Sequence, residues 1–184
     1  MRAPIGNFDQ ATPAPDCLDL LVEPVAAAIR GWQGPVAADQ LLYVDTDPEK
    51  ADTAVFVETY GEDLAGTSAN CVVVQGKRGG EARLAACVVA ATTRLDVNGT
   101  VRRRLDVRKA SFAPHELAIG ETGMEYGGVT PLGLPEGWPV LVDAAVADMP
   151  HVLIGSGRRR GKLIVPGKAL LQVPHAELVE GLGR

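Results

Sequence analysis

Two apolar runs that lie close together in the chain place the strongest constraint on its fold. The first is ANCVVVQG at residues 69–76 and the second is RLAACVVAATT at 83–93, with a glycine-rich, charged connection between them. Valine-rich runs bounded by turn residues predict two strands joined as a β-hairpin. Aromatic residues make up only 4% of the chain, so aliphatic side chains must build the core around this hairpin. At 184 residues, the chain is long enough for one domain with a core of its own.

Helical patterns occur on both sides of the hairpin. Residues 17–32 are expected to form a helix in which Pro24 causes a kink or a late start. Residues 45–61 carry the strongest helical pattern, because Pro48 suits the first helical position and Gly61 suits a left-handed stop. Further helical segments are predicted at 94–105, at 114–123 and, as one or two turns each, at 167–173 and 175–182.

Additional strands are predicted between and after these helices, at residues 40–44, 107–113, 139–146, 151–157 and 161–167. Strands and helices therefore interleave, but without the regular βαβ period of a doubly wound sheet. The pattern predicts a single α+β domain in which a twisted mixed β-sheet is flanked by helices. We assign residues 16–184 to this domain. Residues 1–15 contain three prolines and few large apolar groups, so we expect a loosely ordered lead there.

Charge and cysteine content narrow the classes of function. The net charge is −5, so no global basic field draws in nucleic acid; any contact with RNA must be local, and DNA is not expected. The start of the chain has no apolar run, and no stretch is long and apolar enough for a membrane span, so we expect neither a secretory signal nor a membrane anchor. Three cysteines without a CxxC pair favour free thiols in a reducing cytoplasm.

The histidines and cysteines suggest two kinds of site. His115, His151 and His175 have no HxxxH or CxxC partners, so we expect no metal and no cofactor. A nucleophilic pair of a cysteine and a histidine could form in space. Cys71 and Cys87, however, lie in apolar strands, where thiols are usually buried and inert.

Two basic clusters, VRRRL at 101–105 and GSGRRRGK at 155–162, each contain three consecutive arginines. By itself, the first is typical of a solvated helix face and the second of a charged hairpin tip. In the second cluster, flanking glycines would let backbone amides and the guanidinium groups of Arg158, Arg159 and Arg160 face one anion together. A phosphate or a nucleic-acid backbone is the natural ligand of such a group.

The segment EYGGVTPLGLPEG at 125–137 is rich in glycine and proline and has almost no groups for acid–base chemistry. One interpretation is a tight turn between two sheet elements, since the GxGxxG spacing of a nucleotide site is absent. The other is a binding surface made of backbone groups. Pro131 fixes a φ angle and Gly128 lacks a side chain, so the peptide groups between them become rigid donors and acceptors. Such a surface could hold a carbonyl or a developing oxyanion.

Four stretches occur in a distinctive order over roughly residues 47–173: ADTAVFVETYGEDLAGTSANCVVV, ETGMEYGGVTPLGL, VLVDAAV and IGSGRRRGKLIV. As a set they resemble the YbaK/aminoacyl-tRNA synthetase-associated domain family, the free-standing relatives of the editing domain inserted in bacterial prolyl-tRNA synthetases. The resemblance implies an α+β fold whose twisted sheet is partly barrel-like. It also implies hydrolysis of the ester between a wrong amino acid and tRNA, with transient binding of the tRNA acceptor end and a small aminoacyl group.

The resemblance also implies where the site lies. Backbone groups around the aminoacyl carbonyl would come from the loop that comprises Gly127, Gly128, Val129, Thr130 and Pro131. Substrate binding would involve the acidic position on the following strand and the arginine cluster, which correspond to Asp143, Ser156, Gly157, Arg158, Arg159 and Arg160. An activated ester needs only orientation, an oxyanion donor and a positioned water or ribose hydroxyl.

The chain departs from the family pattern at the strand SANCVVV. Many family members have a lysine that is tied to activity just before this apolar run. The matching residue here is Ala69, followed by Asn70, which could donate a hydrogen bond but carries no charge. Lys77 and Arg78 lie beyond the strand, so either would need reach to replace that lysine.

Three functions follow from these observations. We rank a trans-editing aminoacyl-tRNA deacylase first. A non-catalytic module that binds an aminoacyl group, a nucleotide or a protein partner comes second, because of Ala69. A hydrolase of another small ester or thioester comes third, because a backbone oxyanion site is not specific for tRNA.

Overall fold

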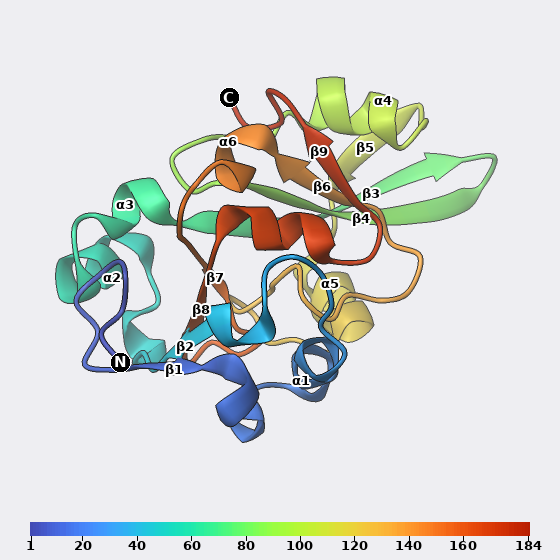
Figure 1. The fold of residues 1–184 in the computed structure, drawn as a ribbon. Coiled ribbons are helices and arrows are strands. Elements are labelled where there is room, and N and C mark those ends of the chain that lie inside the picture. The colour runs from blue at the N-terminus through green and yellow to red at the C-terminus, as the bar shows by residue number, and fades with distance from the viewer.

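Two β-sheets form the framework of the computed structural model, which describes residues 1–184 (Figure 1). The smaller sheet is antiparallel and has the order β1 (Ala11–Pro13), β2 (Leu42–Val44), β8 (Lys162–Val165), β7 (Val152–Gly155). The larger sheet is mixed and has the order β5 (Lys109–Phe112), β3 (Ala69–Arg78), β4 (Glu81–Ala90), β6 (Val140–Asp143), β9 (Ala176–Val179). Strands β4, β6 and β9 run parallel to one another, whereas β3 is antiparallel to both of its neighbours.

The helices are short and lie around the two sheets (Figure 1). They are α1 (Glu23–Arg30), α2 (Thr53–Tyr60), α3 (Leu64–Thr67), α4 (Arg102–Arg104), α5 (His115–Thr122) and α6 (Ala144–Ala147). Short helical segments of one or two turns occur at η1 (Ala14–Asp16), η2 (Leu18–Leu20), η3 (Ala38–Gln40), η4 (Pro48–Lys50), η5 (Val97–Val101) and η6 (Gly167–Gln172). None of the helices combines the length and apolar character that crossing a bilayer requires.

The predicted hairpin is confirmed as β3 and β4, which pair from Ala69 with Ala90 to Arg78 with Glu81. From Ala85 to Ala90, β4 is buried on both faces, which explains the continuous apolar sequence there. Val88 belongs to the largest core cluster, between the two sheets and α1. The neighbouring Cys87 faces a second cluster under η5.

The α+β fold with a mixed sheet and flanking helices is confirmed, but the sheets are not closed into a barrel. Both keep free edges, and a single bridge between Ser68, just before β3, and Leu153 of β7 joins them. The expectation of a partly barrel-like sheet is wrong in this respect. The split matters for function because a cavity opens beside the point where the sheets meet.

Several predicted elements have different limits in the structure. Helix α1 starts late, with Pro24 in its first turn, and Gly61 ends α2 with a φ angle of 130°. The predicted helix at 45–61 is divided into η4 and α2. Residues 175–182, expected to be helical, contain β9 instead, because they pair with β6 from a distant part of the chain.

Residues 1–15, expected to be a loosely ordered lead, pack on the smaller sheet. Ala11 in β1 and Ala14 after it are fully buried. Phe8 stacks on Tyr60 of α2 with the ring centroids 5.3 Å apart. This segment thereby covers the outer face of the sheet that carries β7 and β8.

Candidate functional site

A cavity of about 830 Å³ opens where β3 begins, between α2, α5, β7 and the segment that contains Gly127. It is lined by 28 residues, of which 18 are hydrophobic. Its only carboxylate is that of Asp52, whereas two cationic side chains, Arg159 and Lys162, belong to its wall. The cavity is therefore a largely apolar site with positive charge on one side.

The glycine-rich segment at 125–137, here called the glycine loop, is bound to the turn at 155–162, here called the arginine turn. Gly157 donates its N–H to the carbonyl oxygen of Gly128 at 2.8 Å. Glu125 donates its N–H to the carbonyl oxygen of Gly157, also at 2.8 Å. Two motifs that are separate in the sequence thus form one interlocked unit beside the cavity.

Glycine is required for this close approach of two backbones. A Cβ atom on Gly128 would overlap the backbone carbonyl of Arg158. A Cβ on Gly155 would lie 2.5 Å from the carbonyl oxygens of both Gly128 and Val129. The glycines therefore position the loop on the arginine turn, in addition to permitting its bends.

In the glycine loop, the peptide N–H groups of Gly127 and Val129 have no acceptor within the protein. Both residues line the cavity. Two N–H groups next to them are occupied: that of Gly128 donates to a carbonyl of the same loop at 3.0 Å, and that of Thr130 donates to the sulfur of Met124 at 3.4 Å. Unpaired donors on a fixed backbone beside an apolar cavity can bind a carbonyl oxygen and stabilise an oxyanion.

Lys162 at the start of β8 is a cavity residue that the sequence pattern does not single out. Its side chain is partly buried, and Nζ donates a hydrogen bond to the carbonyl oxygen of Gly127 at 3.2 Å. Burial, and secondarily the nearby Arg159, lower the pKa of Lys162 below its ordinary value. The one signal in the sequence is its position at the end of GSGRRRGK, after three more conspicuous arginines.

Ala69 and Asn70 open β3 and line the same cavity as the glycine loop. Ala69 is buried in the largest core cluster, whereas Asn70 is exposed. Lys77 and Arg78 lie at the far end of β3, and the rise of a strand puts Lys77 about 23 Å from Asn70. They cannot replace the family lysine at Ala69, but Lys162 brings an ammonium group to the cavity from a different strand.

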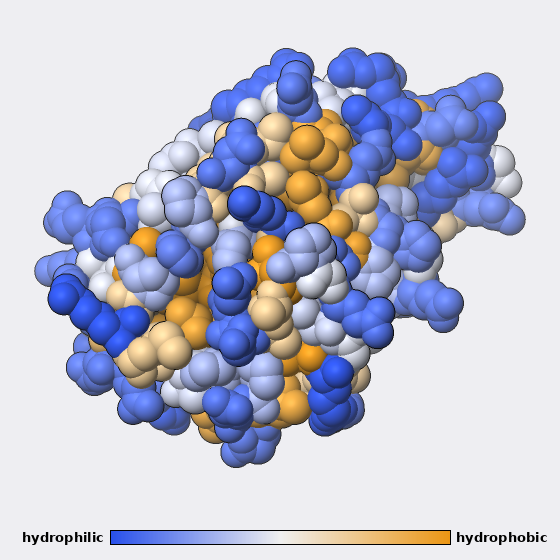
Figure 2. Space-filling view, viewed as in Figure 1, coloured by the Kyte–Doolittle hydropathy of each residue, from blue (hydrophilic) through white to orange (hydrophobic).

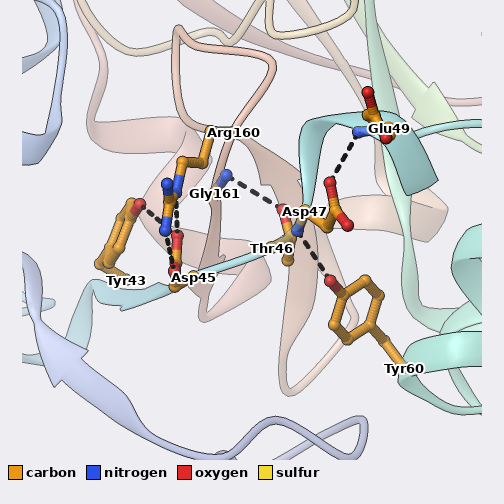
Figure 3. A network of polar contacts seen from close by, with 8 residues as sticks. All are labelled: Tyr43, Asp45, Thr46, Asp47, Glu49, Tyr60, Arg160 and Gly161. Atoms are coloured by element: carbon orange, nitrogen blue, oxygen red, sulfur yellow. Dashed lines mark hydrogen bonds and ion pairs between the residues drawn. The ribbon is translucent and has the colours of Figure 1, made fainter.

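Arg160 fastens the arginine turn to the end of β2 (Figure 3). Its guanidinium donates to both carboxylate oxygens of Asp45, at 2.8 and 2.7 Å, and these bonds lower the pKa of that carboxyl. Next to it, Gly161 donates its N–H to the hydroxyl of Thr46 at 3.0 Å. Burial, and then the neighbouring Asp45, raise the pKa of Tyr43 to about 12. Arg160 is thus engaged within the protein and does not line the cavity.

The other arginines of the turn also bind groups of the protein. Arg158 donates to the carbonyl oxygen of Leu21 at 3.3 Å, and Arg159 donates through Nε to that of Pro48 at 2.9 Å. Buried Ser156 directs its hydroxyl to carbonyl oxygens inside the turn. The three guanidinium groups therefore do not converge on one anion, and only Arg159 reaches the cavity wall.

Five further predicted site residues lie outside the cavity lining: Gly128, Thr130, Pro131, Asp143 and Gly157. Asp143 is buried at the start of α6, where its carboxylate accepts from the N–H groups of Ala145 at 3.1 Å and Gly183 at 2.6 Å. Thr130 and Pro131 are buried behind the cavity-facing part of the glycine loop. The hydroxyl of Thr130 has no hydrogen-bond partner.

The cysteines and histidines do not assemble into a nucleophilic or metal site. Cys71 lines the cavity, but burial raises the pKa of its thiol well above the ordinary value. Burial also raises the pKa of Cys87 to about 12. His115 packs edge-on against Tyr126 at the cavity, with ring centroids 4.9 Å apart. No group of three His, Cys, Asp or Glu side chains is placed to hold a metal ion.

The chain matches a family model described as "Aminoacyl-tRNA editing domain" over residues 47–173. Among solved structures, it is similar to "a putative trans-editing enzyme for prolyl tRNA synthetase", with 21% identity, a TM-score of 0.67 and coverage of 86% of this chain and 97% of that one. It is also similar to a structure from "Epitope backbone grafting by computational design", with 22% identity, a TM-score of 0.66 and coverage of 88% and 95%. No curated protein sequence matches the chain. At these identities the structural likenesses show a shared fold.

Proposed function

Because this chain belongs to the aminoacyl-tRNA editing domain family, we propose that it is a trans-editing deacylase that hydrolyses the ester of mischarged tRNA. The observation that carries this proposal is the pair of unpaired backbone N–H groups, on Gly127 and Val129, in the wall of a largely apolar cavity. In this proposal, the acceptor end of a tRNA in the cytoplasm enters only transiently and presents its aminoacyl group to the cavity.

The reaction needs little acid–base chemistry from the protein. The oxygen of a water molecule attacks the ester carbonyl carbon while that water gives a proton to the surrounding solvent, and a tetrahedral oxyanion forms. The N–H groups of Gly127 and Val129 stabilise that oxyanion. The carbon–oxygen bond to the ribose then breaks, and the leaving oxygen takes a proton to give free tRNA and a free amino acid. The amide of Asn70, which lines the same cavity, is suited to orient the attacking oxygen.

Lys162 provides the positive charge that Ala69 lacks. Its ammonium group is fixed on the carbonyl oxygen of Gly127 at 3.2 Å, next to the proposed oxyanion donors. In a mostly apolar site this charge favours the negatively charged transition state more than it would in water. Arg159, on the same side of the cavity, is placed to bind the last phosphate of the acceptor end. Both cations disfavour substrates with positively charged amino-acid side chains.

The direct test is hydrolysis of a panel of mischarged aminoacyl-tRNAs by the purified protein. We expect at least one aminoacyl group with an electrically neutral side chain to be released faster than in buffer. Lys162→Met and Asn70→Ala should both slow that reaction, while the exposed-surface control Lys168→Gln should not. If every member of the panel is hydrolysed no faster than in buffer, the deacylase proposal fails. Small aminoacyl esters and thioesters in the same panel test the broader hydrolase function.

A second function, a non-catalytic binding module on the same fold, is favoured by Ala69 at the position of the family lysine. The discriminating variant is Ala69→Lys, with Ala69→Met as a control of similar size without charge. If only Ala69→Lys hydrolyses mischarged tRNA, the natural protein is a binding module that lacks the catalytic charge. If the wild type is already active and Ala69→Lys changes its rate little, the binding-module function is rejected.

A further inference from the structure

The cations of this acidic protein are concentrated in one part of the chain. Of its 18 lysines and arginines, nine lie between residues 77 and 109, a segment with three carboxylates, although the whole chain has a net charge of −5. This segment contains the end of the β3–β4 hairpin, α4 and the start of β5. The hairpin end protrudes at the right of Figure 1, and the same region of Figure 2 is covered with hydrophilic side chains.

Some of these cations already have partners within the protein, but six of them do not. Arg78 pairs with Asp106, and Arg104 pairs with Glu177. Five of these six, here called the basic end, are exposed, form no ion pair and lie at or near the hairpin end, α4 and β5: Lys77, Arg102, Arg103, Arg108 and Lys109. The sixth, Arg94, follows the opposite end of β4 and is not part of this group.

Specific contacts hold the basic end together as one surface. Arg83 of β4 donates to the carbonyl oxygen of Leu105 at 2.9 Å, and Arg78 binds Asp106 through its carboxylate. These bonds hold the connection between α4 and β5 in contact with the hairpin. The free cations of α4, β3 and β5 are therefore neighbours on a fixed scaffold.

Two of the cations oppose each other directly. Lys77 of β3 and Lys109 of β5 are partners in the antiparallel register. Like charges at opposing positions destabilise a sheet, and nearby arginines add to the repulsion. An anion that binds across this surface would relieve that cost. A polyanion suits it best, because the cations are spread over three elements.

The same two strands connect the basic end to the cavity. Strand β5 begins at Lys109 and ends at Phe112, which lines the cavity. Strand β3 begins at the cavity with Asn70 and reaches Lys77 after about 23 Å. One extended anionic ligand can therefore lie along β3 and β5 with its end in the cavity.

We propose that the basic end binds the phosphate backbone of the tRNA stem while the aminoacyl end occupies the cavity. The identity of this RNA rests on the proposed function, whereas the preference for a polyanion rests on the surface itself. RNA fits better than an anionic membrane, since none of the large hydrophobic side chains that the protein exposes lies between residues 77 and 109. Phosphate contacts of this kind position an RNA without reading its sequence.

The test is binding of uncharged tRNA, measured by fluorescence anisotropy over a range of salt concentrations. We compare Arg102→Gln/Arg103→Gln with a control of equal charge change, Arg2→Gln/Lys168→Gln, whose residues are also exposed. At about 0.1 M salt, loss of two phosphate contacts should weaken binding at least tenfold and lower the salt slope by about 2. The control should change binding less than about twofold, and both proteins should keep the wild-type Tm.

A second probe, the single-stranded 3′-terminal tetranucleotide of the tRNA, shows which part of the tRNA contacts the basic end. Its binding should be the same in the wild type and in Arg102→Gln/Arg103→Gln, because it does not reach the basic end. Three outcomes would overturn the proposal. The two double variants could lose the same amount of tRNA affinity, or Arg102→Gln/Arg103→Gln could bind tRNA as the wild type does. The third outcome is that the protein binds anionic lipid vesicles in place of tRNA.

Uncharged tRNA separates this inference from the proposed catalysis. If hydrolysis is absent but Arg102→Gln/Arg103→Gln selectively weakens tRNA binding, the basic end is a tRNA surface on a non-catalytic module. If hydrolysis is present but the double variant binds tRNA like the wild type, the inference about the basic end fails alone.

Discussion

The protein contains the tripeptide Arg-Arg-Arg twice, at 102–104 and at 158–160, and the two copies have opposite environments. The second copy forms the arginine turn, where each guanidinium binds a carbonyl or carboxylate of the protein. In the first copy, only Arg104 has a partner, Glu177, while Arg102 and Arg103 remain exposed and unpaired.

This difference changes which arginines are candidates for binding RNA. From the sequence alone, the flanking glycines make the second copy the stronger candidate for an anion site. The same glycines, however, allow the turn to pack on the glycine loop, which binds Arg158 and Arg160 to groups of the protein and leaves only Arg159 at the cavity. The first copy follows a helical turn whose apolar side is buried, so its charges point to solvent.

The largest effect should come from breaking the contact between the glycine loop and the arginine turn. In Gly128→Ala, the added Cβ would overlap the backbone of Arg158, so the two segments must separate. We expect the free energy of unfolding to fall by about 1–3 kcal/mol and hydrolysis of mischarged tRNA to fall by at least about 100-fold. Denaturant titration and single-turnover hydrolysis measure these changes.

A matched glycine provides the control for that substitution. Gly120 lies in α5 with open space around its Cβ position. Gly120→Ala should raise the free energy of unfolding by about 0.5–1 kcal/mol and leave hydrolysis unchanged. Similar losses in the two variants would show that the close approach at Gly128 has no special role.

The next effect concerns Lys162, which contacts the glycine loop from β8. Lys162→Met should slow hydrolysis by about 10- to 100-fold without lowering the Tm at neutral pH, because it removes a partly buried charge. Lys162→Arg, which keeps the charge, should retain part of the rate. A lower Tm with an unchanged rate would mean that Lys162 is a structural residue.

The pH dependence of stability provides a second readout for Lys162. Its pKa is lowered in the folded state by burial, so the unfolded chain holds this proton more tightly. The wild-type free energy of unfolding should therefore gain a contribution as the pH rises from the lowered pKa toward the ordinary value of 10.5. That contribution should be absent from the stability curve of Lys162→Met, so the difference between the wild-type and variant curves isolates it.

The smallest effects compare one arginine from each triplet. Arg160→Gln breaks the ion pair with Asp45. Because the side chains of Arg160 and Asp45 are 64% and 56% exposed, the Tm should fall by only a few degrees. Arg103→Gln should leave the Tm unchanged and weaken the binding of uncharged tRNA. Thermal unfolding measures the Tm of both variants, and fluorescence anisotropy measures their affinity for uncharged tRNA. If Arg160→Gln weakens tRNA binding more than Arg103→Gln, the distinction between the triplets is wrong.

Local patterns were sufficient for the elements that depend on neighbouring residues. The hairpin of β3 and β4 follows from two apolar runs and a glycine turn. The late start of α1 follows from Pro24. By contrast, β9 was predicted to be helical because its partner, β6, lies far away in the chain and leaves no mark on the local sequence.

The candidate site was predictable only in part. Gly127 and Val129 of the glycine loop line one cavity with Asn70, whereas Gly128, Thr130 and Pro131 do not. Asp143 is instead held by the N–H groups of Ala145 and Gly183, since an aspartate after a strand can cap the helix that follows. Lys162 was missed because its role depends on contact with a loop 35 residues earlier.

The sequence by itself determined the family, the α+β class and the segments that carry glycine, arginine and apolar strands, because these depend on residue type and order. Only the tertiary structure decided which charges remain free. Partners such as Asp45 for Arg160 and Glu177 for Arg104 are brought together by folding over long stretches of chain. Two identical tripeptides can therefore differ in role, since hydrogen bonding and burial depend on neighbours in space.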